Sequence, residues 1–123
     1  MKDDAQILFI DDEPINLQLF EIVFGSKYPT SLALSGKTGL EMLASSTSIR
    51  VVLCDMKMPV MNGLEFASRA KELYPDLHIY ILTGYLISQE MREAIKDGLI
   101  EGYLNKPFER EEIEKALDGV LAL

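Results

Sequence analysis

Short apolar segments alternate with segments of helical spacing along the whole chain, and this alternation limits the folds that the sequence can adopt. Five apolar runs, rich in Ile, Val, Leu and Tyr, fall at residues 5–10, 30–34, 50–54, 77–82 and 101–105. Runs of about five or six such residues are typical of strands buried on both faces of a sheet. Strands that alternate with helices indicate a parallel sheet covered by helices on both faces.

Helix start and stop signals divide the segments between these runs. Pro14 stands near the start of the first segment, at a position that tolerates the missing N–H. Asn62, with Glu65 three residues later, forms an N-terminal capping pattern, and Gly98 ends the fourth segment. The expected helices cover residues 14–25, about 36–46, 62–74, 88–98 and 109–123.

No linker or shift in composition divides the 123 residues, so we expect one domain over residues 1–123. The net charge of −8 argues against a nucleic-acid or anionic-membrane surface, because both need clustered Lys and Arg. The N-terminus has no apolar leader, and no run approaches the roughly 18 apolar residues of a membrane span. Together with the single cysteine, Cys54, this favours a reducing, cytoplasmic compartment and no membrane insertion.

Polar residues stand at the ends of four of the five expected strands. They are Asp11, Asp12 and Glu13 after the first, Asp55 at the end of the third, Thr83 at the end of the fourth and Lys106 just after the fifth. Ligands of doubly wound sheets bind at the carboxyl ends of the strands, near the point where the strand order reverses. In the flavodoxin-like order 2-1-3-4-5, strands one and three are neighbours, and the three aspartates would converge.

Converging carboxylates repel one another and stay ionised at neutral pH only if a cation lies among them. Hard carboxylate oxygens with room for water select Mg²⁺ or Mn²⁺ over zinc. Lys106 and Thr83 would add a positive charge and a hydroxyl donor on the far side of Asp55, which suits an incoming anion. The residues therefore predict an aspartyl-phosphate site, in which metal, lysine and hydroxyl together hold the phosphoryl group.

Four motifs, IDDEP, LCDMKMPVMNG, ILTG and YLNKPF, follow one another along essentially the whole chain. In this order and at this spacing, they resemble the receiver domains of two-component response regulators, including the chemotaxis receivers. The resemblance implies a (βα)5 three-layer sandwich that accepts a phosphoryl group from a histidine kinase or histidine phosphotransfer protein. It also implies a downstream protein partner, bound by the face of the fourth helix, fifth strand and fifth helix. Such a domain is a monomer or a phosphorylation-dependent dimer, and it catalyses only its own phosphorylation and dephosphorylation.

The resemblance assigns the metal and phosphoryl ligands to individual residues. Asp55 resembles the phosphoacceptor, and Asp11 and Asp12 resemble the acidic pair that organises Mg²⁺. Within that pair, Asp12 is expected to bind the metal directly and Asp11 through water. Asp55 and the main-chain carbonyl of Lys57 are the other expected metal ligands.

The resemblance also supplies a switch. Thr83 resembles the hydroxyl that turns inward to the phosphoryl oxygen, and Lys106 resembles the lysine that pairs with this oxygen. Tyr103 resembles the aromatic residue whose rotamer follows Thr83, and Pro107 resembles the proline that commonly follows a cis peptide here. Gly84 stands where alanine is commonest and would keep the approach to Asp55 open.

The first helix carries two sets of apolar residues. The set expected to face the sheet is Leu19, Phe20, Val23 and Phe24. The set expected outside it, beside the Asp55 pocket, is Ile15 and Ile22 with Gln18 nearby. We interpret this second set as a docking surface for the histidine-bearing helix of the donor, as in similar receivers. The alternative is that these residues are half-buried flanks of the helix.

Three other interpretations fit parts of the sequence. A phosphatase of the haloacid-dehalogenase type needs a second aspartate two residues after the nucleophile, where this chain has Lys57. A flavodoxin-like cofactor binder needs a first loop rich in Ser, Thr and Gly, where this chain has Asp-Asp-Glu. A degenerate receiver would act as a protein-interaction scaffold without phosphorylation.

With 123 residues and no room for a DNA-binding output domain, we expect a stand-alone receiver or a piece of a hybrid kinase or longer regulator. The one histidine, His78, has no acidic neighbour in the sequence and is expected in a loop.

Overall fold

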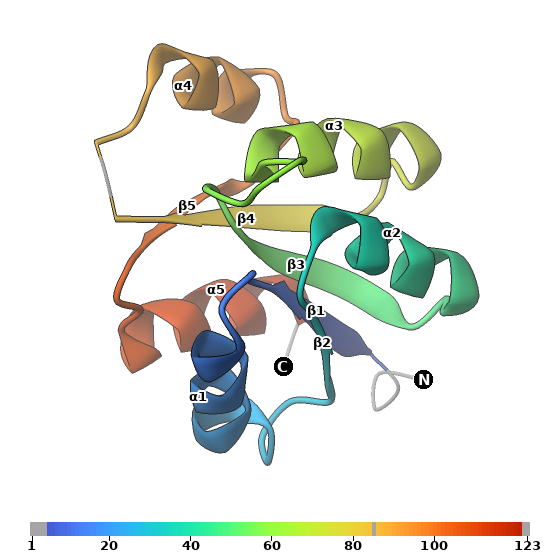
Figure 1. The fold of residues 1–123 in the computed structure, drawn as a ribbon, viewed down its shortest axis with the longest axis vertical. Coiled ribbons are helices and arrows are strands. Elements are labelled where there is room, and N and C mark those ends of the chain that lie inside the picture. Colours follow the sequence, from blue (N-terminus) through green and yellow to red (C-terminus); the bar gives the residue numbers. More distant parts are fainter. Residues whose placement is uncertain (1–4, 85, 122–123) are drawn as a thin grey trace.

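The computed structural model describes residues 5–84 and 86–121, and in these residues strands and helices alternate strictly (Figure 1). The elements are β1 (Gln6–Ile10), α1 (Pro14–Phe24), β2 (Thr30–Ala33), α2 (Gly36–Ser45), β3 (Ile49–Asp55), α3 (Gly63–Leu73), β4 (His78–Thr83), α4 (Gln89–Lys96), β5 (Gly102–Asn105) and α5 (Arg110–Leu121). All strand pairs are parallel, and the order is β2-β1-β3-β4-β5. The predicted doubly wound sheet is therefore confirmed.

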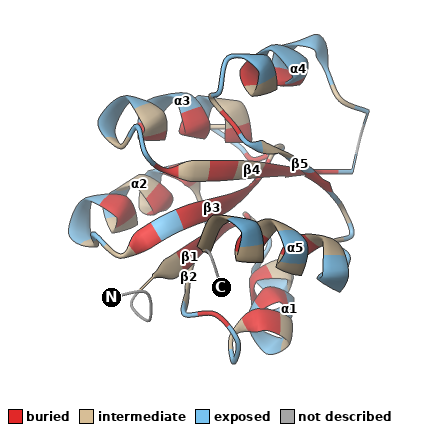
Figure 2. Ribbon diagram, turned by 180° about the vertical axis from the view of Figure 1, so that it is seen from behind, coloured by how far each residue is buried: buried red, intermediate tan, exposed pale blue. Residues whose placement is uncertain are grey.

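Helices cover both faces of the sheet, with α1 and α5 on one face and α2, α3 and α4 on the other (Figure 1). Successive residues of a strand point to opposite faces, so the central strands supply both apolar cores. In β3, Val51 and Leu53 join the core under α1 and α5, and Val52 and Cys54 join the core under α2 and α3. Buried residues accordingly run almost without interruption along the central strands in Figure 2.

The register brings the carboxyl ends of the strands to one edge of the sheet. Ile10 pairs with Cys54, Asp55 with Leu82 and Thr83 with Asn105. Asp55 and Thr83 are the last residues of β3 and β4, so their backbones are held by the sheet. Within the described residues, no helix combines the length and the apolar character needed to cross a bilayer.

The predicted cap at Asn62 is present, and the start of α4 has a side-chain cap as well. The Asn62 side chain accepts a hydrogen bond from the Glu65 backbone N–H, and the Glu65 carboxylate accepts one from the Asn62 N–H, both at 2.9 Å. Ser88 caps α4 by accepting from the backbone N–H of Met91. Gly98 follows α4 with φ +78°, a conformation that glycine adopts without steric cost.

The prediction for the inner face of α1 was partly wrong. The buried residues are Leu17, Phe20 and Phe24, whereas Leu19 is 46% exposed and Val23 is half-buried. Residues spaced by three, four and seven lie on one helix face, and Leu19 lies about 200° around the helix from Leu17. Phe20 stacks on Phe9 of β1 with ring centroids 4.1 Å apart, and this contact fixes which face turns inward.

Candidate functional site

Three carboxylates meet at the edge where β1 and β3 end. One oxygen from each of Asp11, Asp12 and Asp55 can be chosen so that all three lie within 4.8 Å of one another. Asp11 and Asp55 are buried, and Asp12 is half-buried. The convergence expected from the sequence is therefore present in the structure, because β1 and β3 are neighbours in the sheet.

The start of α1 holds Asp11 in place. The Asp11 carboxylate accepts hydrogen bonds from the backbone N–H of Glu13 and from the side-chain amide of Asn16, both at 3.0 Å. Glu13 is the N-cap of α1 and Asn16 lies in its first turn, so the start of the helix positions both donors. Sequence reasoning missed the role of Asn16. The only sign of this role in the sequence is a side-chain amide five residues after an aspartate. The Asp11 oxygens are thus largely occupied, whereas Asp12 keeps a more open carboxylate.

Lys106 reaches the carboxylates from the end of β5. Its Nζ lies 3.2 Å from an oxygen of Asp55 and 3.4 Å from an oxygen of Asp11. The Lys106 N–H donates to the Thr83 carbonyl at 3.0 Å, and the following peptide bond to Pro107 is cis, as expected. One ammonium group therefore faces two buried carboxylates.

Burial and the neighbouring charges shift the pKa values of Asp55 and Lys106. Burial raises the pKa of Asp55 and the Asp11 charge adds to it, although Lys106 acts in the opposite direction. Burial by itself would lower the pKa of Lys106, but Asp55 and Asp11 together hold this pKa above its ordinary value. Lys106 thus contacts two of the three converging carboxylates, and a bound cation would further offset their charge.

An open pocket of about 520 Å³ gives access to this group. It is lined by Asp12, Glu13, Asp55, Met56, Lys57, Thr83, Gly84 and Lys106. A Cβ added at Gly84 would lie 3.7 Å from the nearest heavy atom outside its chain neighbours, the Lys106 carbonyl oxygen, so an alanine would also fit there. Tyr85, the residue after Gly84, lies outside the described residues.

The remaining predicted residues, Tyr103 and the set on α1, are not among those that line this pocket. Tyr103 of β5 is 39% exposed and sits two residues before Asn105, the register partner of Thr83. Ile15 and Ile22 on α1 are 59% and 76% exposed, and Gln18 is exposed as well. Leu19 falls on the same side of α1 and extends this set to a stripe at spacings of four and three residues.

The side chains present fit a hard divalent cation. Carboxylate oxygens are ligands that Mg²⁺ and Mn²⁺ accept, and an open pocket leaves room for the waters that Mg²⁺ retains. No thiol or imidazole lies among the residues that line the pocket. Asp12 and Asp55 supply carboxylate oxygens, and Lys57 borders the same space.

The parallel sheet of order 2-1-3-4-5 carries an acidic cluster and a lysine at its carboxyl edge, the arrangement that the receiver motifs led us to expect. The sequence matches the response regulator receiver domain family over residues 7–118, and the chain belongs to this family. The receiver resemblance and the fold class expected from the motifs are therefore confirmed.

Curated relatives and solved structures agree with this assignment. The chain is 31% identical to the transcriptional regulatory protein ZraR of Escherichia coli K12 over 98% of its length. It is 32% identical to the sensor histidine kinase RcsC of the same strain over 94% of its length. It spans only 27% and 12% of those two proteins, respectively.

Solved structures show the same fold throughout. A response regulator receiver domain protein from Clostridium thermocellum superposes with a TM-score of 0.89 at 31% identity, covering 96% of this chain and 94% of that one. The chemotaxis protein CheY4 of Vibrio cholerae gives a TM-score of 0.82 at 28% identity, covering 94% and 98%.

Proposed function

We propose that this domain is the phosphoacceptor of a two-component phosphorelay and that Asp55 receives the phosphoryl group. The observation that carries the proposal is the position of the Asp55 carboxylate. It lies at the end of the central strand, 3.2 Å from the Lys106 ammonium and beside two further carboxylates. A phosphohistidine of a histidine kinase or of a histidine phosphotransfer protein is the proposed donor.

The proposed reaction is a transfer between two nucleophiles. An oxygen of Asp55 forms a bond to phosphorus while the N–P bond of the phosphohistidine breaks, and the electron pair returns to the imidazole nitrogen. In this proposal, the Lys106 ammonium and the Thr83 hydroxyl would contact phosphoryl oxygens as this occurs. Water later attacks the phosphorus and releases phosphate, which restores the Asp55 carboxylate. The domain acts on its own aspartate and on no separate substrate.

The reaction is proposed to require Mg²⁺, with Mn²⁺ as a substitute. Asp12, Asp55 and the main-chain carbonyl of Lys57 would hold the ion directly, and Asp11, whose oxygens already accept three hydrogen bonds, would act through water. When bound, the ion supplies positive charge that offsets the carboxylates and the phosphoryl oxygens.

The proposed switch runs from Thr83 to Tyr103. A phosphoryl group on Asp55 would draw the Thr83 hydroxyl inward, and the half-exposed Tyr103 ring would follow into the space beside β4. The altered face of α4, β5 and α5 would then bind a downstream protein or a second receiver. We place the domain in the cytoplasm, because its free Cys54 thiol suits a reducing compartment.

The exposed stripe on α1 is the proposed docking surface for the donor. Ile15 and Ile22, with Gln18 beside them, lie on the helix that begins directly after the aspartate turn. Replacing Ile15 and Ile22 by serine should slow transfer from a phosphohistidine donor and leave labelling by acetyl phosphate unchanged. Leu73→Ser, at a similarly exposed leucine on α3, is the matched control and should change neither rate. Equal losses in both assays would contradict the docking role.

Incubation with acetyl phosphate and Mg²⁺ tests the central proposal. Intact-mass spectrometry should show the addition of one phosphoryl group, which EDTA and Asp55→Asn each abolish. Lys106→Ala should slow the labelling, because the ammonium nearest to Asp55 is lost. A chain that stays unmodified would instead be a scaffold receiver, and a modification that survives Asp55→Asn would place the acceptor elsewhere.

A further inference from the structure

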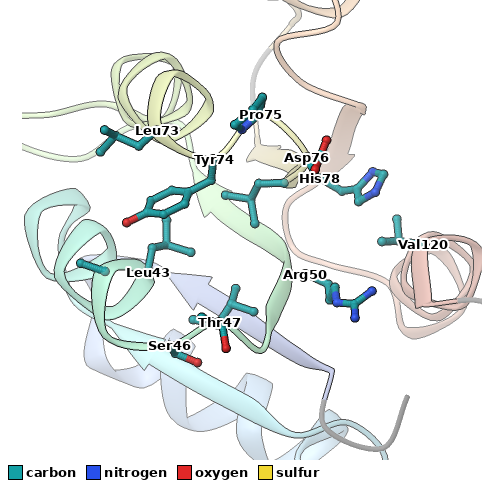
Figure 3. A pocket seen from close by; sticks show the side chains of 13 residues that line it. Leu43, Ser46, Thr47, Arg50, Leu73, Tyr74, Pro75, Asp76, His78 and Val120 are labelled. Atoms are coloured by element: carbon teal, nitrogen blue, oxygen red, sulfur yellow. The ribbon is translucent and has the colours of Figure 1, made fainter. Parts of the chain in front are cut away.

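A second pocket lies at the opposite edge of the sheet, where the strands begin. Its volume is about 670 Å³, which is within the range of about 300–1,000 Å³ typical of small-molecule sites. It opens between the ends of α2 and α3 and the starts of β3 and β4 (Figure 3). β3 runs from Ile49 at this pocket to Asp55, a separation of roughly 20 Å at the rise of a strand, so the pocket is separate from the phosphoryl site.

The floor of this pocket is apolar and rigidly held. Leu43, Ile49 and Leu77 are at most 8% exposed, so their positions are set by the core beneath them. Tyr74, at the end of α3, is half-buried and forms a side wall next to Leu43 (Figure 3). An apolar ligand body would therefore meet a preformed surface and need little rearrangement.

Arg50 borders the same pocket and is set apart from the sheet by a bulge. Gln6 pairs with Ile49 and Ile7 with Val51, so Arg50 is the extra residue of β3 at this step. A bulge of this kind redirects a side chain, and Arg50 is exposed within an otherwise buried strand. Within residues 5–84 and 86–121, its guanidinium has neither a hydrogen-bond partner nor an ion-pair partner.

The charges around the pocket define what it can accept. His78 borders it across from Tyr74, but its Nδ1 is paired with the carboxylate of Glu101. Among the described residues that line the pocket, Arg50 is therefore the cation without a partner. The carboxylate of the rim belongs to Asp76, on the turn before β4. An arginine fork binds a carboxylate through two parallel hydrogen bonds, whereas Asp76 would repel a carboxylate placed on its side.

We propose that this pocket binds a small carboxylic acid whose aromatic or alkyl body lies on Leu43, Tyr74 and Leu77 and whose carboxylate pairs with Arg50. The proposal does not depend on phosphorylation of Asp55. β3 and β4 each have one end at this pocket and the other end at the phosphoryl site.

The test is a titration of the ¹⁵N-labelled domain with 4-phenylbutyrate, followed by amide chemical shifts. Saturable shifts are expected at residues 46–50 and 73–78, and not at the residues around Asp55. The neutral analogue 4-phenylbutan-1-ol has the same apolar body and should bind about three- to tenfold more weakly, as expected for one charge-assisted contact at a partly exposed site. Absence of saturable shifts, equal affinity for acid and alcohol, or shifts centred on Asp55 would each overturn the proposal.

Variants at the rim separate charge from shape. Arg50→Gln should remove the preference for the acid and Arg50→Lys should restore part of it. Asp76→Asn should strengthen binding of the acid. Arg92→Gln, at an exposed arginine of α4 that does not line this pocket, removes the same charge and should change nothing. An Arg50→Gln protein that keeps its dispersed spectrum and its full preference for the acid would refute the role of Arg50.

Discussion

Gly63, the first residue of α3, approaches the backbone of the phosphoacceptor more closely than a side chain allows. A Cβ at this position would lie 2.8 Å from the Asp55 carbonyl oxygen, 3.0 Å from Cδ1 of Ile81 and 3.1 Å from Cα of Met56. Two of these three atoms are backbone, so a change of rotamer cannot relieve the contact. The Gly63 N–H also donates to the Met56 carbonyl at 2.9 Å, which ties α3 to the loop after Asp55.

The cost of Gly63→Ala follows from two opposing effects. Ordinary van der Waals contact begins near 3.4 Å, so the backbone at Asp55 must move by about 0.3–0.6 Å. Overpacking of this kind costs about 1–3 kcal/mol, and alanine regains up to about 1 kcal/mol of helix propensity, less at a first helical position. We expect a net loss of about 1–2 kcal/mol in the free energy of unfolding. With a urea slope of about 1–3 kcal/mol/M, the midpoint should fall by about 0.5–1 M.

Urea unfolding followed by circular dichroism measures this loss, and two other glycines provide the controls. Gly119→Ala, in α5, meets no atom within 4 Å and should raise the stability by about 0.5–1 kcal/mol through helix propensity. Gly84→Ala meets only ordinary contacts at 3.7 Å and 3.8 Å and should leave the stability nearly unchanged. Gly63→Ala should also slow labelling by acetyl phosphate, because it displaces Asp55. A Gly63→Ala protein as stable as the native chain would refute the close approach.

Three further predictions concern charge, backbone strain and a buried hydroxyl. The raised pKa of Asp55 means that its ionised form destabilises the fold, so Asp55→Asn should stabilise the metal-free domain at neutral pH. This gain in stability should shrink as the pH falls toward 3.8, the ordinary pKa of an aspartate, and also when Mg²⁺ is added. Urea unfolding measures both changes. Val60 is fully exposed with φ +70°, so Val60→Asn should raise the free energy of unfolding by about 1 kcal/mol; an unchanged midpoint would contradict the strain. The Tyr28 hydroxyl donates to Asp118 at 2.7 Å, so Tyr28→Phe should cost about 1 kcal/mol. Burial, followed by the Asp118 contact, raises the Tyr28 pKa, so the native chain should lose stability above pH 10, where Tyr28→Phe should be less sensitive.

Local signals were sufficient to predict the helices and strands, whereas the meeting of residues around Asp55 was predicted from sheet topology. The capping pattern at Asn62 and Glu65 is a contact over three residues, and the structure contains both of its hydrogen bonds. The pocket around Asp55 could be predicted because parallel strands deliver the residues at their carboxyl ends to one edge. Lys106 therefore lies near Asp55, although it follows Asp55 by 51 positions in the sequence and no local signal connects the two residues.

The features that the sequence did not reveal depend on where elements lie relative to one another. Leu17 is buried and Leu19 is exposed because Phe20 stacks on Phe9, a contact between α1 and β1 that α1's own spacing does not specify. His78 was expected in a loop without acidic company, yet it begins β4 and pairs with Glu101, because the segment leading into β5 runs beside the start of β4.

The bulge at Arg50 belongs to the same group of features, because a register shift is a property of a strand pair and leaves no mark in either strand alone. This difference explains why the two ends of β3 were unequally predictable. At Asp55 the chemistry lies in residue types whose meeting is dictated by topology. At Arg50 the chemistry lies in one exposed side chain, and the pairing of β3 with β1 decides where this side chain points. In the sequence, Arg50 is simply a charged residue before an apolar run.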